Sequence, residues 1–172
     1  MNQIPQILQG FNMYVGGSPD PTVVDVELPE ITKMTETLSG AGIGGEIEVP
    51  IEGNFESMET TINLRVPNSR ILATLAAGGH SLTFRGGIQL QDNSRATPVI
   101  RTQPIRVSMN VMSKSFSMGT GTAAAAMDSS ATYEVTYMRV SIDNMDVIEI
   151  DKFNRIFKVN GVDTLAQLRR AL

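Results

Sequence analysis

The sequence predicts a mainly β fold: a sandwich or barrel of antiparallel strands, with one helix packed outside it, a short C-terminal helix and a long hairpin arm. Three observations predict this class. Several runs alternate apolar and polar residues, turn-forming residues separate the runs, and only two short segments have helical spacing. A chain of 172 residues is long enough for one core and too short for two. We therefore expect a single domain over residues 1–172.

Four runs ahead of the C-terminal region alternate with the period of a half-buried strand. They are Thr22–Leu28, Thr60–Val66, Leu82–Leu90 and Ile105–Val111. The apolar positions that represent the sheet-forming strands among them are Ile62, Leu64, Val107 and Met109. We expect each of these strands to bury one face and to leave the other in water.

The strand predicted over Tyr133–Ile142 changes face along its length. Tyr133 and Tyr137 share one face, whereas Val140 belongs to the other. Either a bulge near Tyr137 shifts the register, or both faces are buried at different points because a neighbouring subunit covers part of the strand. The second interpretation is favoured here. A turn at residues 143–146 then leads into a further strand, Val147–Ile150.

Two short helices are predicted. Asn68 and Ser69 can cap a helix that runs to Ala77, where two glycines end it, and this helix is expected on the outside of the barrel. Asp163 or Thr164 can cap a C-terminal helix. The leucines expected on the docking face of that second helix are Leu165, Leu168 and Leu172.

Two segments have neither period. Glu30–Gly53 contains four glycines in six residues and indicates a long hairpin arm or a mobile loop. Lys114–Ala131 is rich in alanine, serine and glycine, and it predicts a flexible loop between two strands.

Nothing in the sequence indicates catalysis, a cofactor or a metal. His80 is the single histidine and has no identifiable partner, so it is interpreted as a strand-entry residue. Asp143, Asp146 and Asp151 lack the spacing of a calcium loop and fit turn chemistry instead. There is no cysteine, and no apolar run is long enough to span a bilayer, so we expect no stable membrane association. A net charge of −4 and the absence of tryptophan argue against tight nucleic-acid binding.

The C-terminal sequence IEIDKFNRIFKVNGVDTLAQLRRAL resembles the end of the major tail tube proteins of contractile-tailed phages and of related R-type pyocins. Its motifs are Glu149–Asp151 (EID), Asn160–Asp163 (NGVD) and the terminal leucines. The pair Leu28–Pro29 and the glycines of Gly40–Gly45 match the N-terminal part of the same pattern. The segment Lys114–Ala131 departs from it, because an alanine- and serine-rich loop stands where charged residues are usual.

This resemblance implies a homo-hexameric ring that stacks into a hollow tube, with a contracting sheath that drives the tube into a cell envelope. The implied partners are the tail sheath protein, a tape-measure protein, baseplate and tail-terminator proteins, and double-stranded DNA in transit. The implied location is the tail tube of a virion, assembled in the cytoplasm of the bacterial host. An acidic protein without a basic patch suits a conduit through which DNA slides without sticking.

Within this reading, Lys33–Gly53 is predicted to be the inter-ring arm. Its assigned residues are Lys33, Met34, Thr35, Leu38, Gly40, Gly42, Ile43, Gly44 and Gly45. The predicted ring-forming strands are represented by Ile62, Leu64, Val107, Met109, Tyr137 and Val140. Two alternatives stay open: the tube subunit of an R-type bacteriocin or of a type VI secretion-like contractile system, and a monomeric β-sandwich binding module.

Overall fold

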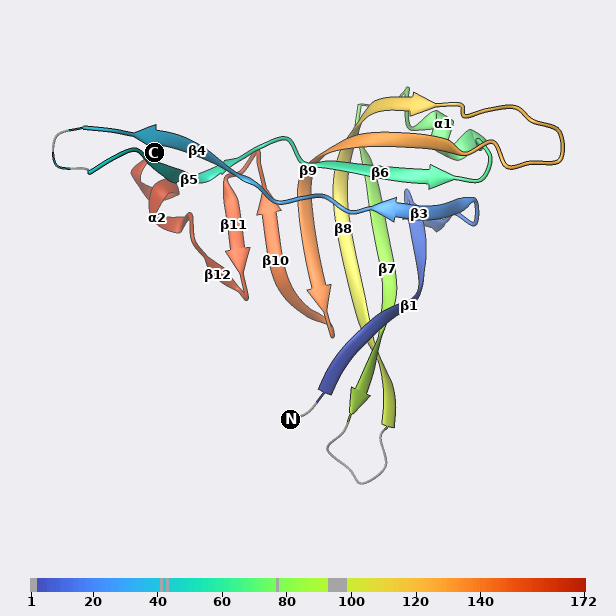
Figure 1. Cartoon of the computed structure of the whole chain (residues 1–172), viewed down its shortest axis with the longest axis horizontal. Coiled ribbons are helices and arrows are strands. Elements are labelled where there is room, and N and C mark those ends of the chain that lie inside the picture. The colour runs from blue at the N-terminus through green and yellow to red at the C-terminus, as the bar shows by residue number, and fades with distance from the viewer. Residues whose placement is uncertain (1–2, 41, 43, 77, 93–98) are drawn as a thin grey trace.

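The chain folds around one strongly curved, ten-stranded antiparallel sheet, with a separate two-stranded arm and two short helices (Figure 1). The computed structural model describes residues 3–40, 42, 44–76, 78–92 and 99–172. In chain order the elements are β1 (Gln3–Val15), β2 (Ser18–Pro19), β3 (Val23–Glu27), β4 (Lys33–Leu38), β5 (Ile47–Phe55), β6 (Glu59–Leu64), α1 (Ser69–Ala73), β7 (His80–Asp92), β8 (Val99–Ser117), β9 (Ser129–Ile142), β10 (Met145–Asp151), β11 (Ile156–Val159), β12 (Val162–Asp163) and α2 (Ala166–Ala171). The prediction of a mainly antiparallel β fold is confirmed.

Two layers arise because the longest strands bend. The main path of the sheet runs β12-β11-β10-β9-β8-β7-β1-β2, while β6 pairs with the first half of β9 and β3 pairs with β6. Figure 1 shows β3 and β6 crossing over the upper part of the long strands. The apolar side chains of both layers meet between them, and α1 closes one end of the core. The buried apolar core residues are Met13, Val15, Met58, Ile62, Leu64, Ile71, Leu82, Phe84, Val107, Met109, Val111, Ala131, Tyr133, Val135, Met138 and Ile150.

A β-bulge explains the change of face in β9. Asn110 pairs with Tyr137 and Val111 pairs with Val135, which leaves Thr136 as the extra residue. Because one residue is inserted, Val135 and Met138 are both buried on the same side of the sheet. The favoured interpretation, a neighbouring subunit covering the second face, is therefore corrected: the bulge keeps the apolar residues of β9 on one core face.

The first helix is capped as predicted but is shorter. The Asn68 side chain accepts a hydrogen bond from the backbone of Ile71 at 2.9 Å. The α-helix ends at Ala73, because the next residue, Thr74, turns its backbone N–H and its hydroxyl onto the Ile71 carbonyl. The predicted end at Ala77 lies outside the described residues. Ile71 is buried in the core, so α1 is anchored to the end of the sheet.

The second helix docks by one leucine rather than three. Asp163 accepts a hydrogen bond from the backbone of Leu165 at 3.0 Å, and α2 follows from Ala166. Leu165 is buried, whereas Leu168 is 39% exposed and Leu172 is 79% exposed. The predicted leucine face is thus corrected: no residue of α2 itself is buried, and the one buried leucine of the three is its N-cap residue, Leu165.

The predicted flexible loop Lys114–Ala131 is largely strand at its two ends. β8 continues to Ser117 and β9 begins at Ser129, so residues 118–128 make the connection. Ala131 is fully buried, because it lies where β9 pairs with β6 and its side chain is part of the core between the two layers. The connection is also tied to the body, since the backbone of Met127 donates to the Arg65 carbonyl at 2.9 Å.

Candidate assembly surfaces

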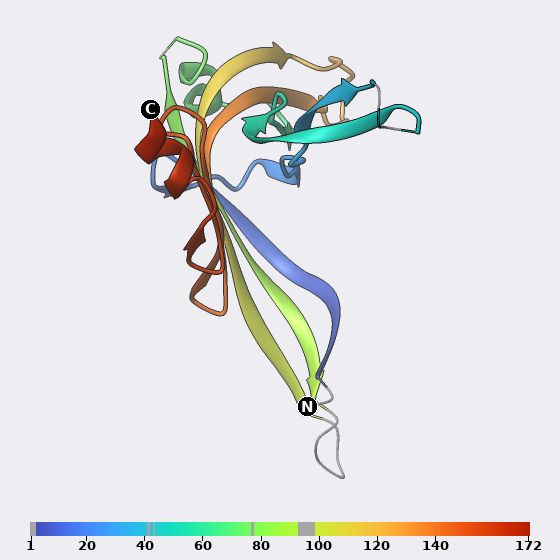
Figure 2. The ribbon, with the colours of Figure 1, turned by 90° about the vertical axis from the view of Figure 1, so that its left-hand side faces the viewer.

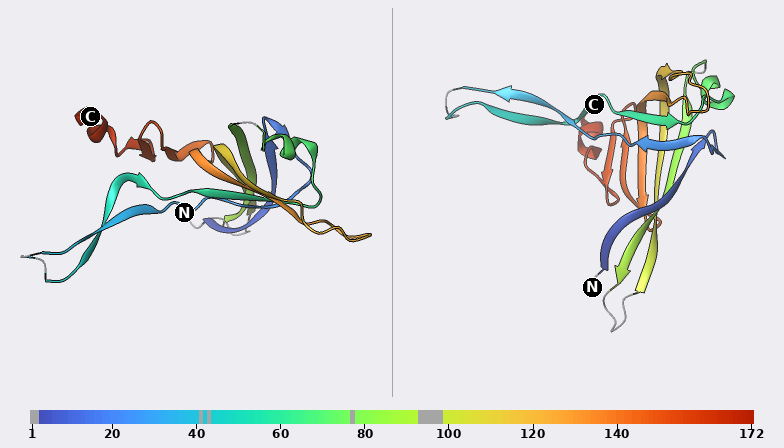
Figure 3. Two further views of the ribbon diagram at one scale, coloured as in Figure 1. Left: turned by 90° about the horizontal axis from the view of Figure 1, so that it is seen from above. Right: turned by 45° about the vertical axis from the view of Figure 1, so that its right-hand side comes forward.

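The segment predicted to be an arm forms a hairpin that extends away from the core (Figures 1 and 3). β4 and β5 pair only with each other among the described strands, and Leu38 lies opposite Ile47 near the tip. Both faces of the hairpin are open to solvent, because it stands clear of the sheet. The exposed apolar residues along it are Met34, Leu38, Ile47 and Val49. Gly40, Gly42, Gly44 and Gly45 lie at its tip, and the assigned Ile43 lies outside the described residues.

The base of the arm rests on the C-terminal elements. The ammonium of Lys33 pairs with Glu52 at 2.7 Å and lies 5.7 Å from the centroid of the Phe157 ring. Phe157 also packs edge-on against Phe55, with 5.2 Å between ring centroids. Gly53 has a φ of +84°, and a Cβ there would approach Leu165 to 3.0 Å. Only the base of the arm is fixed by the body, because these contacts all lie at its root.

A second projection was not predicted from the sequence. The outer halves of β1, β7 and β8 continue beyond the second layer as a three-stranded blade (Figure 2). We call this blade, residues 3–10, 88–92 and 99–104, the extension. One of its faces is polar, with the amides of Gln6, Gln9, Gln89 and Gln91 and the hydroxyl of Thr102 linked by hydrogen bonds of 2.6–3.0 Å.

The other face of the extension is apolar and uncovered. A groove of about 320 Å³ lies there, lined by Pro5, Gln6, Ile7, Leu8, Leu28, Phe84, Ile88 and Ile105. Ile7 is 61% exposed and Leu8 is 47% exposed, because β3 and β6 cover the sheet only further up. Together with the arm, this groove makes two exposed apolar surfaces at separate projections of the molecule.

The side chains assigned to the ring-forming strands fall into two groups. Ile62, Leu64, Val107 and Met109 are buried inside the subunit, and Val140 packs against the same core. They hold the sheet together from within. Tyr137 lies on the opposite, polar face, where its hydroxyl donates to Glu149 at 3.0 Å. Apart from the groove of the extension, which Ile105 of β8 helps to line, we expect side-chain contacts of these strands with a neighbour to come from their polar face.

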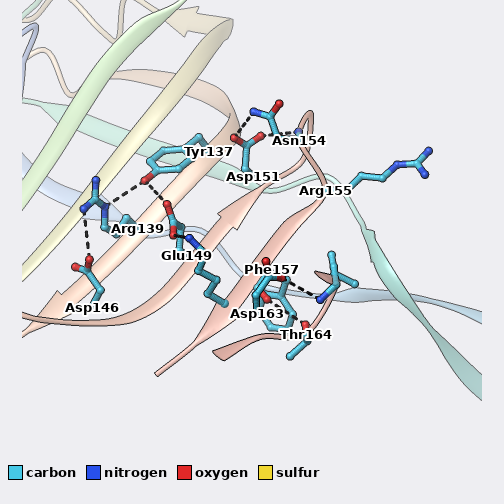
Figure 4. A network of polar contacts seen from close by, with 12 residues as sticks. Tyr137, Arg139, Asp146, Glu149, Asp151, Asn154, Arg155, Phe157, Asp163 and Thr164 are labelled. Atoms are coloured by element: carbon cyan, nitrogen blue, oxygen red, sulfur yellow. Dashed lines mark hydrogen bonds and ion pairs between the residues drawn. The ribbon is translucent and has the colours of Figure 1, made fainter. Parts of the chain in front are cut away.

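A charged network covers the polar face around β9 and β10 (Figure 4). The Arg139 guanidinium donates to the hydroxyl of Tyr137 at 3.1 Å and pairs with Asp146 at 3.4 Å. Lys158 donates to the second oxygen of Glu149 at 2.8 Å. The hydrogen bond from Lys158 is the main reason that the pKa of the Glu149 carboxyl lies below its usual value.

This lowered pKa predicts a specific sensitivity to acid. A carboxyl with a depressed pKa in the folded state stabilises the protein above its unfolded pKa, and that contribution is lost as the pH falls through the folded pKa. We expect Glu149→Gln to weaken the protein near neutral pH and to flatten the fall of its unfolding free energy between about pH 5 and 3. Urea unfolding across that range measures the slope. Glu36→Gln, at an exposed arm position, is the control, and equal slopes for wild type and Glu149→Gln would contradict the prediction.

The remaining candidate residues have structural roles. His80 begins β7, and its Nε2 lies 3.0 Å from the Thr74 carbonyl oxygen. Asp151 accepts hydrogen bonds from the backbone of Phe153 and Asn154, as a turn residue does, and Asp143 has a left-handed φ of +53° in the β9–β10 turn. Within the described part of the chain, no group of three or more acidic, histidine or cysteine residues is placed to hold a metal ion. Nor do the described residues contain a helix long and apolar enough to cross a membrane.

A family model and two sequence relatives agree on one family. The family model described as phage tail tube protein FII matches residues 5–172. The tail tube protein of Escherichia phage P2 is 31% identical over 173 residues, which cover 97% of this chain and 96% of the relative. The major tail tube protein of Serratia phage KSP20 is 26% identical over 161 residues, with 92% and 90% covered. In fold, the chain is similar to a solved structure described as the sheath/tube terminator of an extracellular contractile injection system in its extended state, with a TM-score of 0.55, 17% identity, and 81% of this chain and 96% of that one covered.

Proposed function

The chain belongs to the family of phage tail tube protein FII, and on that premise we propose that its subunits close into six-membered rings that stack as the inner tube of a contractile phage tail. A tail tube subunit is a structural protein rather than an enzyme. The family match over nearly the whole chain carries this proposal. It also sets aside the monomeric binding module.

The free edge of β1 supports ring closure. On one side β1 pairs with β7 along most of its length, but on the other side Tyr14 and Val15 alone pair with another described strand, β2. An unpaired edge of this length is a template for another strand. A closed ring of identical subunits would cover it in every copy, without leaving a terminal edge.

The two projections support stacking. The arm, Lys33–Gly53, is proposed as one inter-ring contact, with its exposed apolar residues packing on a subunit of the adjacent ring. The apolar groove of the extension is proposed as the second contact, also covered by another copy of this chain. Both surfaces are apolar and uncovered in the isolated subunit, and both lie on parts of the molecule that reach beyond its core.

The polar face of the long strands is proposed to line the lumen. The opposite face of the same sheet is covered by β3 and β6 in its upper part and is apolar along the extension, so it is poorly suited to line a water-filled channel. In this arrangement the layer formed by β3 and β6, together with α1, faces outward, toward a sheath. The lumen is occupied first by the tape-measure protein and later by the double-stranded DNA. Baseplate and tail-terminator proteins would close the two ends. Tail tubes are parts of the virion, and assembly is proposed to take place in the bacterial cytoplasm.

Electron microscopy of the purified protein tests this function. Negative-stain images taken over a concentration series are expected to show rings and stacked tubes. Sedimentation of the same samples measures the assembled fraction. A protein that stays monomeric at high concentration across salt and pH conditions would contradict the proposal.

A further inference from the structure

The polar face carries a basin of about 800 Å³ across β1, β7, β8, β9 and β10. Gly10 and Gly87, which lie opposite each other in the β1–β7 ladder, form part of its floor, and three arginines surround it. Its lining includes Gly10, Gly86, Gly87, Arg85, Arg106 and Arg139. Glycine and arginine together produce an open, positively charged hollow in a chain whose net charge is −4.

Two of these arginines face each other, with no ion-pair partner for either in the described part of the chain. Arg85 and Arg106 are directly opposite in the β7–β8 ladder. Like charges in that position destabilise a sheet. Neither forms an ion pair within the described residues, although Arg85 lies over the Tyr14 ring at 4.4 Å from its centroid. The third arginine, Arg139, is paired with Asp146, which also lines the basin.

The basin contradicts the expectation that the chain has no basic patch. Arg85, Arg106 and Arg139 are far apart in the sequence and lie on three successive strands, so only the antiparallel register brings them together. The repulsion between Arg85 and Arg106 would be relieved by an anion placed between them. Guanidinium groups suit phosphate oxygens in particular, because their planar donor pairs match the geometry of phosphate.

We propose that this basin contacts the phosphate backbone of double-stranded DNA in the tube. The inference rests on the proposed function, because it requires the polar face to line the lumen. A carboxylate from another protein is less well suited, since the lining of the basin is mainly polar, whereas the core of a protein–protein interface is mainly apolar. Each subunit offers two arginines that have no ion-pair partner among the described residues, so a single subunit binds DNA weakly. The same contact occurs once in every subunit of a ring.

The contact is electrostatic, so it must weaken with salt. Each phosphate neutralised adds about 0.9 to the slope of log affinity against log salt concentration. Binding of a short DNA duplex to the full-length protein is measured by fluorescence anisotropy between about 50 and 200 mM salt. For Arg85→Gln/Arg106→Gln we expect affinity at the lower salt to fall by about tenfold or more, and the salt slope to decrease by about 2.

The matched control is Arg65→Gln/Arg170→Gln, which removes the same charge from exposed positions outside the basin. It is expected to keep near-wild-type affinity and slope. The inference would be overturned by an equal loss of DNA affinity in both variants, or by wild-type tubes that do not bind the duplex. Polyglutamate serves as a carboxylate polyanion for comparison, and selective binding of it in place of DNA would overturn the inference as well. Ring and tube formation by all three proteins is scored by negative stain. If the wild-type protein does not assemble, that result contradicts the proposed function, and the inference that rests on it is contradicted as well.

Discussion

Tube formation is expected to be lost when Leu38 and Ile47 are both replaced by aspartate, while the subunit itself stays folded. The two residues face each other on the arm, and they are 47% and 51% exposed in the isolated subunit. Exposed substitutions of this kind usually change stability by no more than about 0.5 kcal/mol. In a stacked tube the same positions are proposed to be buried, where an unpaired carboxylate costs several kcal/mol. The penalty would be repeated for every subunit of a ring.

Thermal unfolding and negative-stain imaging of the same preparation separate the two effects. The variant Leu38→Met/Ile47→Val keeps the arm apolar and of similar volume, so it is expected to form tubes. Single rings without stacks are the expected product of the aspartate variant. Normal tubes from it would show that the arm does not lie between rings.

Replacing Tyr133 with alanine is expected to lower the free energy of unfolding by about 3–5 kcal/mol, the range for removing a large aromatic side chain from a core. Tyr133 is fully buried, and burial raises the pKa of its phenol. Its hydroxyl lies 2.8 Å from that of Thr74, which itself donates to the Ile71 carbonyl, so the phenol donates to Thr74. The ring therefore joins β9 to α1 as well as filling the core.

Tyr133→Phe isolates the hydrogen bond from the packing. We expect it to cost about 1–2 kcal/mol, because it leaves one buried hydroxyl acceptor without its donor. Tyr137→Ala, at a half-buried position on the polar face, is expected to cost less than Tyr133→Ala. Urea unfolding of the three variants gives the comparison. Similar losses for Tyr133→Ala and Tyr133→Phe would show that the core closes over the missing ring.

The strands found from the sequence are those with a regular face. Ile62 and Leu64 alternate with polar neighbours because β6 buries one side without interruption. β1 gave no such pattern, because register shifts between Pro5 and Ile7 and between Leu8 and Gly10 move its apolar residues from one face to the other. The extension was missed for the same reason, since β1 forms part of it.

The candidate surfaces divide in a similar way. The arm could be predicted because glycines 40, 42, 44 and 45 are close in the sequence and imply a turn far from any core. The basin could not, because its arginines come from three strands and only their register places them together. The C-terminal leucines show a different limit of the sequence. Their helical spacing predicts a helix, but it does not show which of them contact the sheet.

The pairing of β1 has a consequence for the order in which the chain folds. From β7 to β10 each strand pairs with the next along the chain, so these hairpins can close locally. β1 is made first, yet its partner β7 follows after many intervening residues, with Gln3 opposite Asp92 and Val15 opposite Leu82. Such long-range pairing slows folding, because a large loop must close before any contact forms. We therefore expect β1 to stay unpaired until β7 has been made, and we expect premature association with other chains to compete with folding at the docking of β1.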